Sequence, residues 1–158
     1  MSRLLRVAAL LALAFAILAL GACGGSDDRK AKNDYVRQVN AAQNEFGVTV
    51  STVSARITNK SSSSQDRKTL QQFETAIASV VDDLRAIKAP ASVQSEHAQL
   101  VEAMSGFGAQ IKKANSALRN PTQHNIEDAR STIATATQTV NARIDAAIAA
   151  INSKLGKK

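Results

Sequence analysis

Apolar residues recur along most of the chain at alternating steps of three and four, the spacing that places them on one side of an α-helix. The clearest series runs through Leu70, Phe73, Ile77, Val80, Leu84 and Ile87. Because each predicted helix has only one narrow apolar side, the helices have to bury these sides against one another. We therefore predict an all-α fold, an antiparallel up-down four-helix bundle over residues 34–155.

The other three helices are predicted from longer series with the same spacing. The series are Tyr35, Val39, Ala42, Phe46, Val50, Val53 and Ile57 for a helix over 31–58; Val93, His97, Leu100, Met104, Phe107, Ile111, Ala114 and Leu118 for the third helix; and Ile126, Ala129, Ile133, Ala136, Val140, Ile144, Ala147, Ile151 and Leu155 for the fourth. Residues 48–53 are rich in β-branched side chains and would also suit a strand. The apolar series continues through them in phase, which favours the helix.

Three polar or proline-containing segments separate the predicted helices. Residues 59–65 form a polar loop, after which Ser64 or Asp66 can cap the second helix. Residues 89–91 and 120–122 each contain a proline, and we expect Ser92 to cap the third helix.

The first 22 residues have the organisation of an export signal. Arg3 and Arg6 give a basic start, and an uncharged apolar run follows from Val7 to Leu20. At about 14 residues, this run is shorter than the roughly 20 residues that usually span a bilayer.

The run ends in Leu20-Gly21-Ala22-Cys23, which resembles the lipobox of bacterial lipoproteins. In that class the cysteine thiol receives a diacylglyceryl group, and a peptidase cuts just before the cysteine. The resemblance implies a signal peptide over 1–22 and an anchor at Cys23 on the extracytoplasmic side of the cell membrane. An ordinary secretory signal and an uncleaved membrane helix are the alternatives.

Glycine, serine and mixed charges after Cys23 predict a flexible tether over residues 23–33. Residues 156–158 form a basic tail. The tether is short, so we expect the bundle to lie close to the membrane.

Composition excludes several kinds of chemistry. Cys23 is the only cysteine, so its lipidation would leave no thiol for a disulfide, a nucleophile or a metal ligand. The formal net charge of +7 becomes +5 when Arg3 and Arg6 leave with the signal. The remaining basic residues are scattered and few aromatic residues accompany them, which argues against nucleic-acid binding. A mild positive charge suits either solubility or contact with anionic lipid or wall polymers.

Catalytic and metal sites need converging histidines and acids, and the sequence offers few. Its two histidines are His97 and His124, and Glu96 adjoins His97 instead of standing three residues away as in di-iron bundles. We predict no metal, no cofactor and no catalytic residue. His97 occupies an apolar-side position, and counting along parallel helices places Tyr35 at the same height, so we predict a polar layer formed by this pair.

Two further features have open interpretations. Phe46 and Gly47 should lie at nearly the height of Gly106, Phe107 and Gly108, where they would form either a packed layer or a small apolar pocket. The fourth helix also has many uncharged polar residues that would face either a partner or solvent: Ser131, Thr132, Thr135, Thr137, Gln138 and Thr139.

These features predict a membrane-anchored cell-envelope lipoprotein that is not an enzyme and acts as a binding or interaction module. Its partners would be the membrane, through the diacylglyceryl anchor, and an envelope protein or wall polymer. Two alternatives stay open: a carrier or sensor that binds a small apolar ligand between helices, and an envelope enzyme. The sequence leaves the oligomeric state open.

Overall fold

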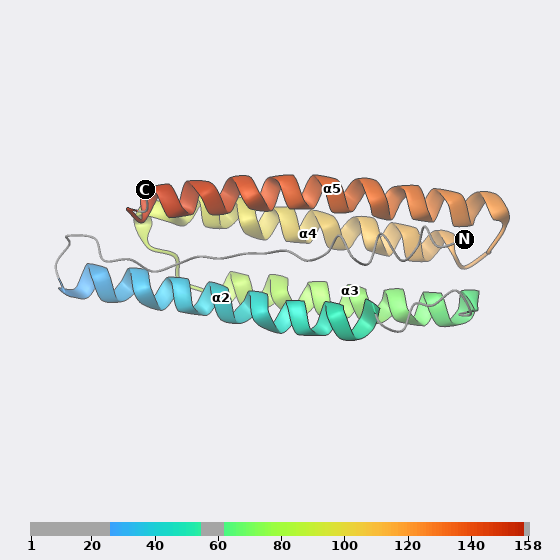
Figure 1. Cartoon of the computed structure of the whole chain (residues 1–158), viewed down its shortest axis with the longest axis horizontal. Coiled ribbons are helices and arrows are strands. Elements are labelled where there is room, and N and C mark those ends of the chain that lie inside the picture. The colour runs from blue at the N-terminus through green and yellow to red at the C-terminus, as the bar shows by residue number, and fades with distance from the viewer. Residues whose placement is uncertain (1–25, 55–61, 157–158) are drawn as a thin grey trace.

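A computed structural model describes residues 26–54 and 62–156 of the chain, and long helices account for most of them (Figure 1). The elements are α2 (Ser26–Ser54), α3 (Ser63–Ala86), the short 3-10 turn η1 (Ala91–Val93), α4 (Gln94–Ala117) and α5 (Gln123–Lys154). Consecutive helices run antiparallel, which confirms the predicted up-down four-helix bundle. Several predicted features lie outside the described residues. They are the signal peptide and its lipobox with Cys23, the apolar position Ile57, and residues 157–158 of the basic tail.

The helices are arranged as two antiparallel pairs, α2 with α3 and α4 with α5 (Figure 1). Contacts are most extensive between α4 and α5, and contacts between α3 and α4 join the two pairs. Small buried side chains on α5, at Ala129, Ala136 and Ala147, permit the close approach of α4. None of the described helices combines the length and apolar character needed to cross a membrane.

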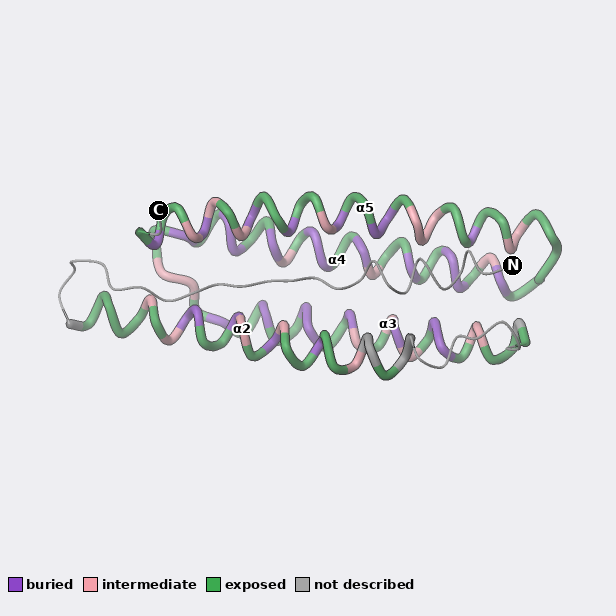
Figure 2. The backbone as a smooth tube through the Cα atoms, in the orientation of Figure 1, coloured by how far each residue is buried: buried purple, intermediate pink, exposed green. Residues whose placement is uncertain are grey.

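The core follows the predicted apolar positions, as the buried side of each helix in Figure 2 shows. Every predicted position of the second and third series is buried, and so are Tyr35, Val39, Ala42 and Phe46 of the first. On α5, Ile126 and Ile133 are only partly buried and pack against the edge of the core.

The start of α2 differs from the prediction. Residues 26–33 were expected to belong to a flexible tether, but they are helical. Asp27 and Asp28 lie in the first turn, where negative charge interacts favourably with the helix dipole. Asp28 also forms an ion pair with Lys32 one turn later, at 2.8 Å. Helix α2 therefore begins at Ser26, five residues before the predicted start at residue 31, and Tyr35 is the first described residue of α2 that is buried in the core.

The cap of α3 also differs from the prediction. Ser62 is the N-cap instead of Ser64 or Asp66. The Gln65 backbone N–H donates to Ser62 Oγ (3.3 Å), and the Ser62 N–H donates to Gln65 Oε1 (2.8 Å). This reciprocal capping box satisfies two backbone donors that the helix itself leaves unpaired.

The helices that follow the two proline segments begin in different ways. Ser92 lies inside η1 and does not cap α4, whose N-cap Val93 makes no side-chain capping bond. Thr122 caps α5 by accepting the Asn125 N–H at 3.2 Å, directly after Pro121.

Three phenylalanines form a packed layer in the middle of the bundle. Phe73 of α3 lies between the other two rings, 6.2 Å from Phe46 and 5.9 Å from Phe107 between ring centroids. The Phe73 and Phe107 rings meet edge to face, a favourable aromatic geometry. A Cβ atom on Gly108 would lie 3.0 Å from Ile77 Cγ2, so that glycine admits a neighbouring side chain. Of the two interpretations of this region, the structure shows the packed layer.

Phe73→Ala should destabilise the bundle by about 3–5 kcal/mol, because it removes the central ring and leaves a cavity between the other two. Urea denaturation followed by circular dichroism would measure the change. Val48→Ala is the matched control, since Val48 is 68% exposed and its loss should change stability by no more than about 0.5 kcal/mol. Equal effects of the two substitutions would contradict the packed aromatic layer.

Candidate functional site

An open groove of about 500 Å³ runs between α4 and α5. Its lining residues are Ala103, Gly106, Phe107, Gln110, Ser131, Thr132, Thr135, Ala136, Thr139, Val140 and Arg143. We call this feature the α4/α5 groove. It exists because small residues line both helices, and a Cβ atom on Gly106 would meet no atom within 4 Å.

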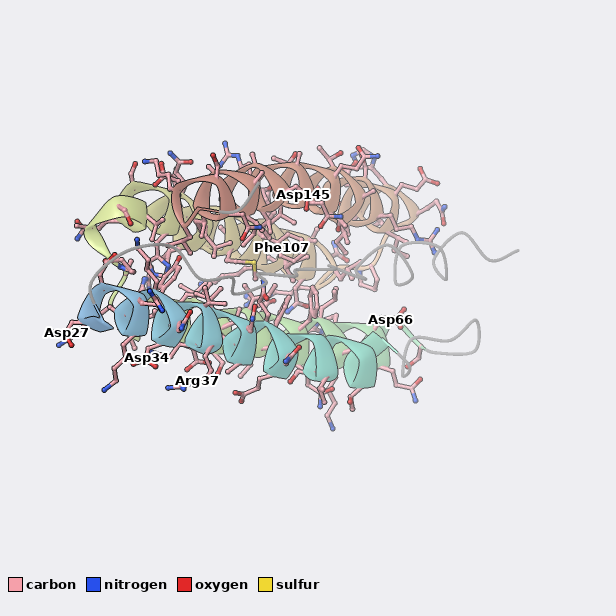
Figure 3. The ribbon with its side chains drawn as sticks, turned by 60° about the vertical axis from the view of Figure 1, so that its left-hand side comes forward. Asp27, Asp34, Arg37, Asp66, Phe107 and Asp145 are labelled. Atoms are coloured by element: carbon pink, nitrogen blue, oxygen red, sulfur yellow. The ribbon has the colours of Figure 1, made fainter. Side chains whose placement is uncertain are left out.

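The floor and the sides of the groove differ in chemistry. Buried apolar residues such as Phe107, Ala136 and Val140 form the floor, and Phe107 lies between the two helix pairs in Figure 3. Exposed hydroxyl and amide side chains form the sides, and Arg143 is the one charged residue of the lining. The groove can therefore hydrogen bond a polar ligand that rests on an apolar base.

Only two of the five residues of the predicted apolar pocket line this groove. Gly106 and Phe107 line it, whereas Phe46, Gly47 and Gly108 do not. Gly47 is exposed on α2, and Ile77 fills the space beside Gly108. The structure thus does not bring the five predicted residues together as one pocket.

The uncharged polar residues of α5 divide into three groups, one of which is Gln138, exposed outside the groove. Ser131, Thr132, Thr135 and Thr139 line the groove. Thr137 is buried elsewhere and donates its hydroxyl to the Ile133 carbonyl at 2.8 Å. Sequence patterns did not identify Gln110 or Arg143 as groove residues, because that depends on how α4 and α5 are rotated against each other.

A polar layer lies at the end of the bundle where α2 begins and α5 ends. Tyr35 Oη is 3.2 Å from His97 Nδ1, and the two rings meet edge to face at 5.5 Å between centroids. Both side chains are buried, Tyr35 with only 1% of its surface exposed. The predicted contact between these two residues is present.

The hydrogen bond made by Nε2 of His97 shows which tautomer of the ring is present. His97 Nε2 lies 2.9 Å from the Leu84 carbonyl oxygen, which can only accept a hydrogen bond. Nε2 therefore carries the proton, and in the neutral ring Nδ1 accepts the Tyr35 hydroxyl proton. Leu84 lies in the last turn of α3, and its carbonyl oxygen also accepts the backbone N–H of Ile87, the C-cap residue, at 3.2 Å. His97 thus adds a second donor to this carbonyl from a different helix.

Burial keeps both side chains of this pair neutral. It lowers the pKa of His97, and the hydrogen bond to the Leu84 carbonyl only partly opposes that shift. Burial, with a smaller contribution from the negative charge of Glu96, raises the pKa of Tyr35 to about 12. An uncharged imidazole and an uncharged phenol are therefore the forms present at pH 7.

An ion pair extends this layer to α5. Lys154 Nζ lies 2.7 Å from Glu96 Oε1, and the hydrogen bond from Lys154 lowers the pKa of the Glu96 carboxyl. With Tyr35 on α2 and the Leu84 carbonyl on α3, all four helices contribute to what we call the four-helix polar layer. The sequence did not predict the ion pair between Glu96 and Lys154, because neither residue belongs to a recognisable chemical motif.

The remaining histidine lies apart from both sites. His124 is exposed on the first turn of α5, with Nε2 3.1 Å from the Asp128 carboxylate. Within residues 26–54 and 62–156, no three histidine, cysteine, aspartate or glutamate side chains are grouped so that they could hold a metal ion.

Comparison with protein-family models, with curated proteins and with solved structures found no match to this chain.

Tyr35→Phe should destabilise the bundle by about 1–3 kcal/mol, because it leaves the buried Nδ1 of His97 without a donor. Thermal or urea denaturation at pH 7.5 would measure the loss. Asp34→Asn is the control on the neighbouring position, since it removes only an exposed ion pair to Arg37 and should cost less than about 1 kcal/mol. A Tyr35→Phe variant as stable as the parent chain would show that the hydrogen bond contributes nothing.

Proposed function

We propose that this chain is a membrane-anchored cell-envelope lipoprotein whose helical bundle is a non-enzymatic binding module. The α4/α5 groove is the observation that carries the binding role. Its partner is an envelope protein or a wall polymer that reaches the side of α4 and α5.

The amino-terminal sequence supports the anchored part of this proposal. Leu20-Gly21-Ala22-Cys23 follows a basic start and an apolar run, as in lipoprotein signals. Only Gly24 and Gly25 separate Cys23 from the first helical residue, Ser26. A fully extended chain covers about 10 Å over that distance, so a lipid on Cys23 would keep the bundle next to the bilayer.

The side chains favour binding over catalysis. Both ring nitrogens of His97 already have hydrogen-bond partners, and its imidazole is buried. The raised pKa of Tyr35 disfavours a reactive phenolate. The groove lining includes serine and threonine but no histidine or carboxylate that could activate them.

The groove chemistry favours a polar partner over an enclosed apolar ligand. Ser131, Thr135 and Thr139 offer hydroxyl groups that both donate and accept hydrogen bonds, and Gln110 adds an amide. Arg143 can bind a carboxylate or phosphate group. The aromatic layer in the core is filled by Phe73, which leaves less support for a small apolar ligand between the helices.

Labelled palmitate should be incorporated into the full-length chain expressed in a bacterial host, and Cys23→Ser should abolish the label. Cell fractionation of both proteins would show whether membrane association is lost together with the label. Equal labelling of the two proteins would exclude lipidation at Cys23.

A photo-crosslinking residue at Thr135 should yield a defined adduct in growing cells, whereas the same residue at Gln138, exposed on α5 outside the groove, should not. Protease or muramidase treatment of the adduct would distinguish a protein partner from a wall polymer. Gly106→Leu should remove the adduct by filling the groove, and Gly47→Leu, at a glycine with equally open surroundings, should preserve it. Equal adducts at positions 135 and 138 would contradict the groove as the binding surface.

A further inference from the structure

The four-helix polar layer contains one group whose charge ordinarily changes near neutral pH, the imidazole of His97. The only other histidine, His124, is exposed and lies outside the layer. We propose that His97 is an acid-sensitive switch, which holds α2 against α4 while neutral and releases α2 when it is protonated. This inference does not depend on the α4/α5 groove or on its partner.

The hydrogen bonds of the neutral state have to rearrange before the ring can hold a second proton. Nε2–H donates to the Leu84 carbonyl, and Nδ1 accepts the Tyr35 hydroxyl proton. A proton taken up from solvent would bind at Nδ1 and point at the hydroxyl hydrogen of Tyr35. The Tyr35 O–H would then have to turn away so that its oxygen could accept from Nδ1–H. Protonation therefore reverses the bond, takes the phenolic proton from its present acceptor and places a positive charge in a buried site.

Groups around His97 come from every helix of the bundle. The neutral phenol of Tyr35 faces it from α2 and the Leu84 carbonyl from α3. Glu96, adjacent on α4, would favour an imidazolium, but its charge is paired with Lys154 of α5 at 2.7 Å. Burial is the largest influence on the pKa of His97 and the hydrogen bond to Leu84 the next, so burial decides which form is preferred.

Two ion pairs lie close in the sequence to the residues that contact His97. On α2, Lys32 is bound to Asp28 at 2.8 Å. Near the end of α3, Arg85 is bound to Asp82 at 3.4 Å, and both side chains are exposed. These pairs leave burial as the dominant influence on the ring.

The contact matters for α2 because of how that helix is held. The main packing neighbour of α2 is α3, and the Tyr35–His97 hydrogen bond reaches past α3 to α4. The buried positive charge and the displaced Tyr35 hydroxyl proton would weaken the link between α2 and the α4/α5 pair. Opening would then expose the buried side of α2, which includes Val39, Ala42 and Phe46.

The direction of the pH effect follows from the lowered pKa of His97. A released, solvated ring binds a proton at its ordinary pKa of 6.5, whereas the buried ring binds it only at lower pH. The closed state is therefore fully favoured above pH 6.5 and loses stability as the pH falls from 6.5 towards the lowered value. In that window each pH unit raises the open population by up to about tenfold.

Amide hydrogen exchange on the full-length chain in detergent, between pH 7.5 and pH 5, tests this switch. After correction for intrinsic exchange rates, the protection of α2 amides should fall with pH inside the window, by up to about tenfold per pH unit. His97→Gln, which cannot titrate, should remove this fall. His124→Gln is the matched control and should preserve it.

NMR titration of the histidine rings in the parent chain provides a measurement that needs no variant. It should show the Nε2–H tautomer of His97 at pH 7.5 and a His97 pKa below 6.5. A pKa above 6.5 would mean that Glu96 stabilises the imidazolium, and it would overturn the proposal. Unchanged α2 protection in the parent chain, or an undiminished fall in His97→Gln, would overturn it as well.

Discussion

Each helix of this bundle has a single apolar side, and the arrangement of the chain depends on burying that side against other helices. Polar residues cover the remaining surface of each helix, so an isolated helix would leave its apolar series in water. Antiparallel packing through short connections brings all four sides together in one core. The aromatic layer of Phe46, Phe73 and Phe107 fills the middle of that core, where three helices contribute one ring each.

A buried histidine is compatible with this core because both of its ring nitrogens are satisfied. An unpaired polar group in the same place would cost stability, whereas the pairs with Tyr35 and the Leu84 carbonyl replace lost contacts with water. These bonds also require that α2 and α3 keep a particular position along the bundle axis relative to α4. Apolar side chains tolerate small shifts along the helix axis more easily than a directional hydrogen bond does.

The sequence predicted the helices and the Tyr35–His97 contact for the same reason: both follow from counting residues along regular helices. Positions on the apolar side repeat with a known period, and helices that run in the same direction reach equal heights after equal numbers of residues. The groove residues Gln110 and Arg143 could not be found in this way, since their meeting depends on the rotation of α4 against α5. The Glu96–Lys154 ion pair joins residues distant in sequence, and exposed charges of both signs are too common for the pair to be recognised.

The helical start of α2 was missed for a different reason. Residues 26–33 have the composition of a linker, and local interactions such as the Asp28–Lys32 pair give them helical structure. In a chain anchored at Cys23, as proposed, a helix that begins three residues later confines the bundle to a thin layer above the bilayer. Such confinement raises the effective concentration of the bundle for any partner that is held in the same layer. The length of the linker would thus select membrane-bound partners before any side chain makes contact.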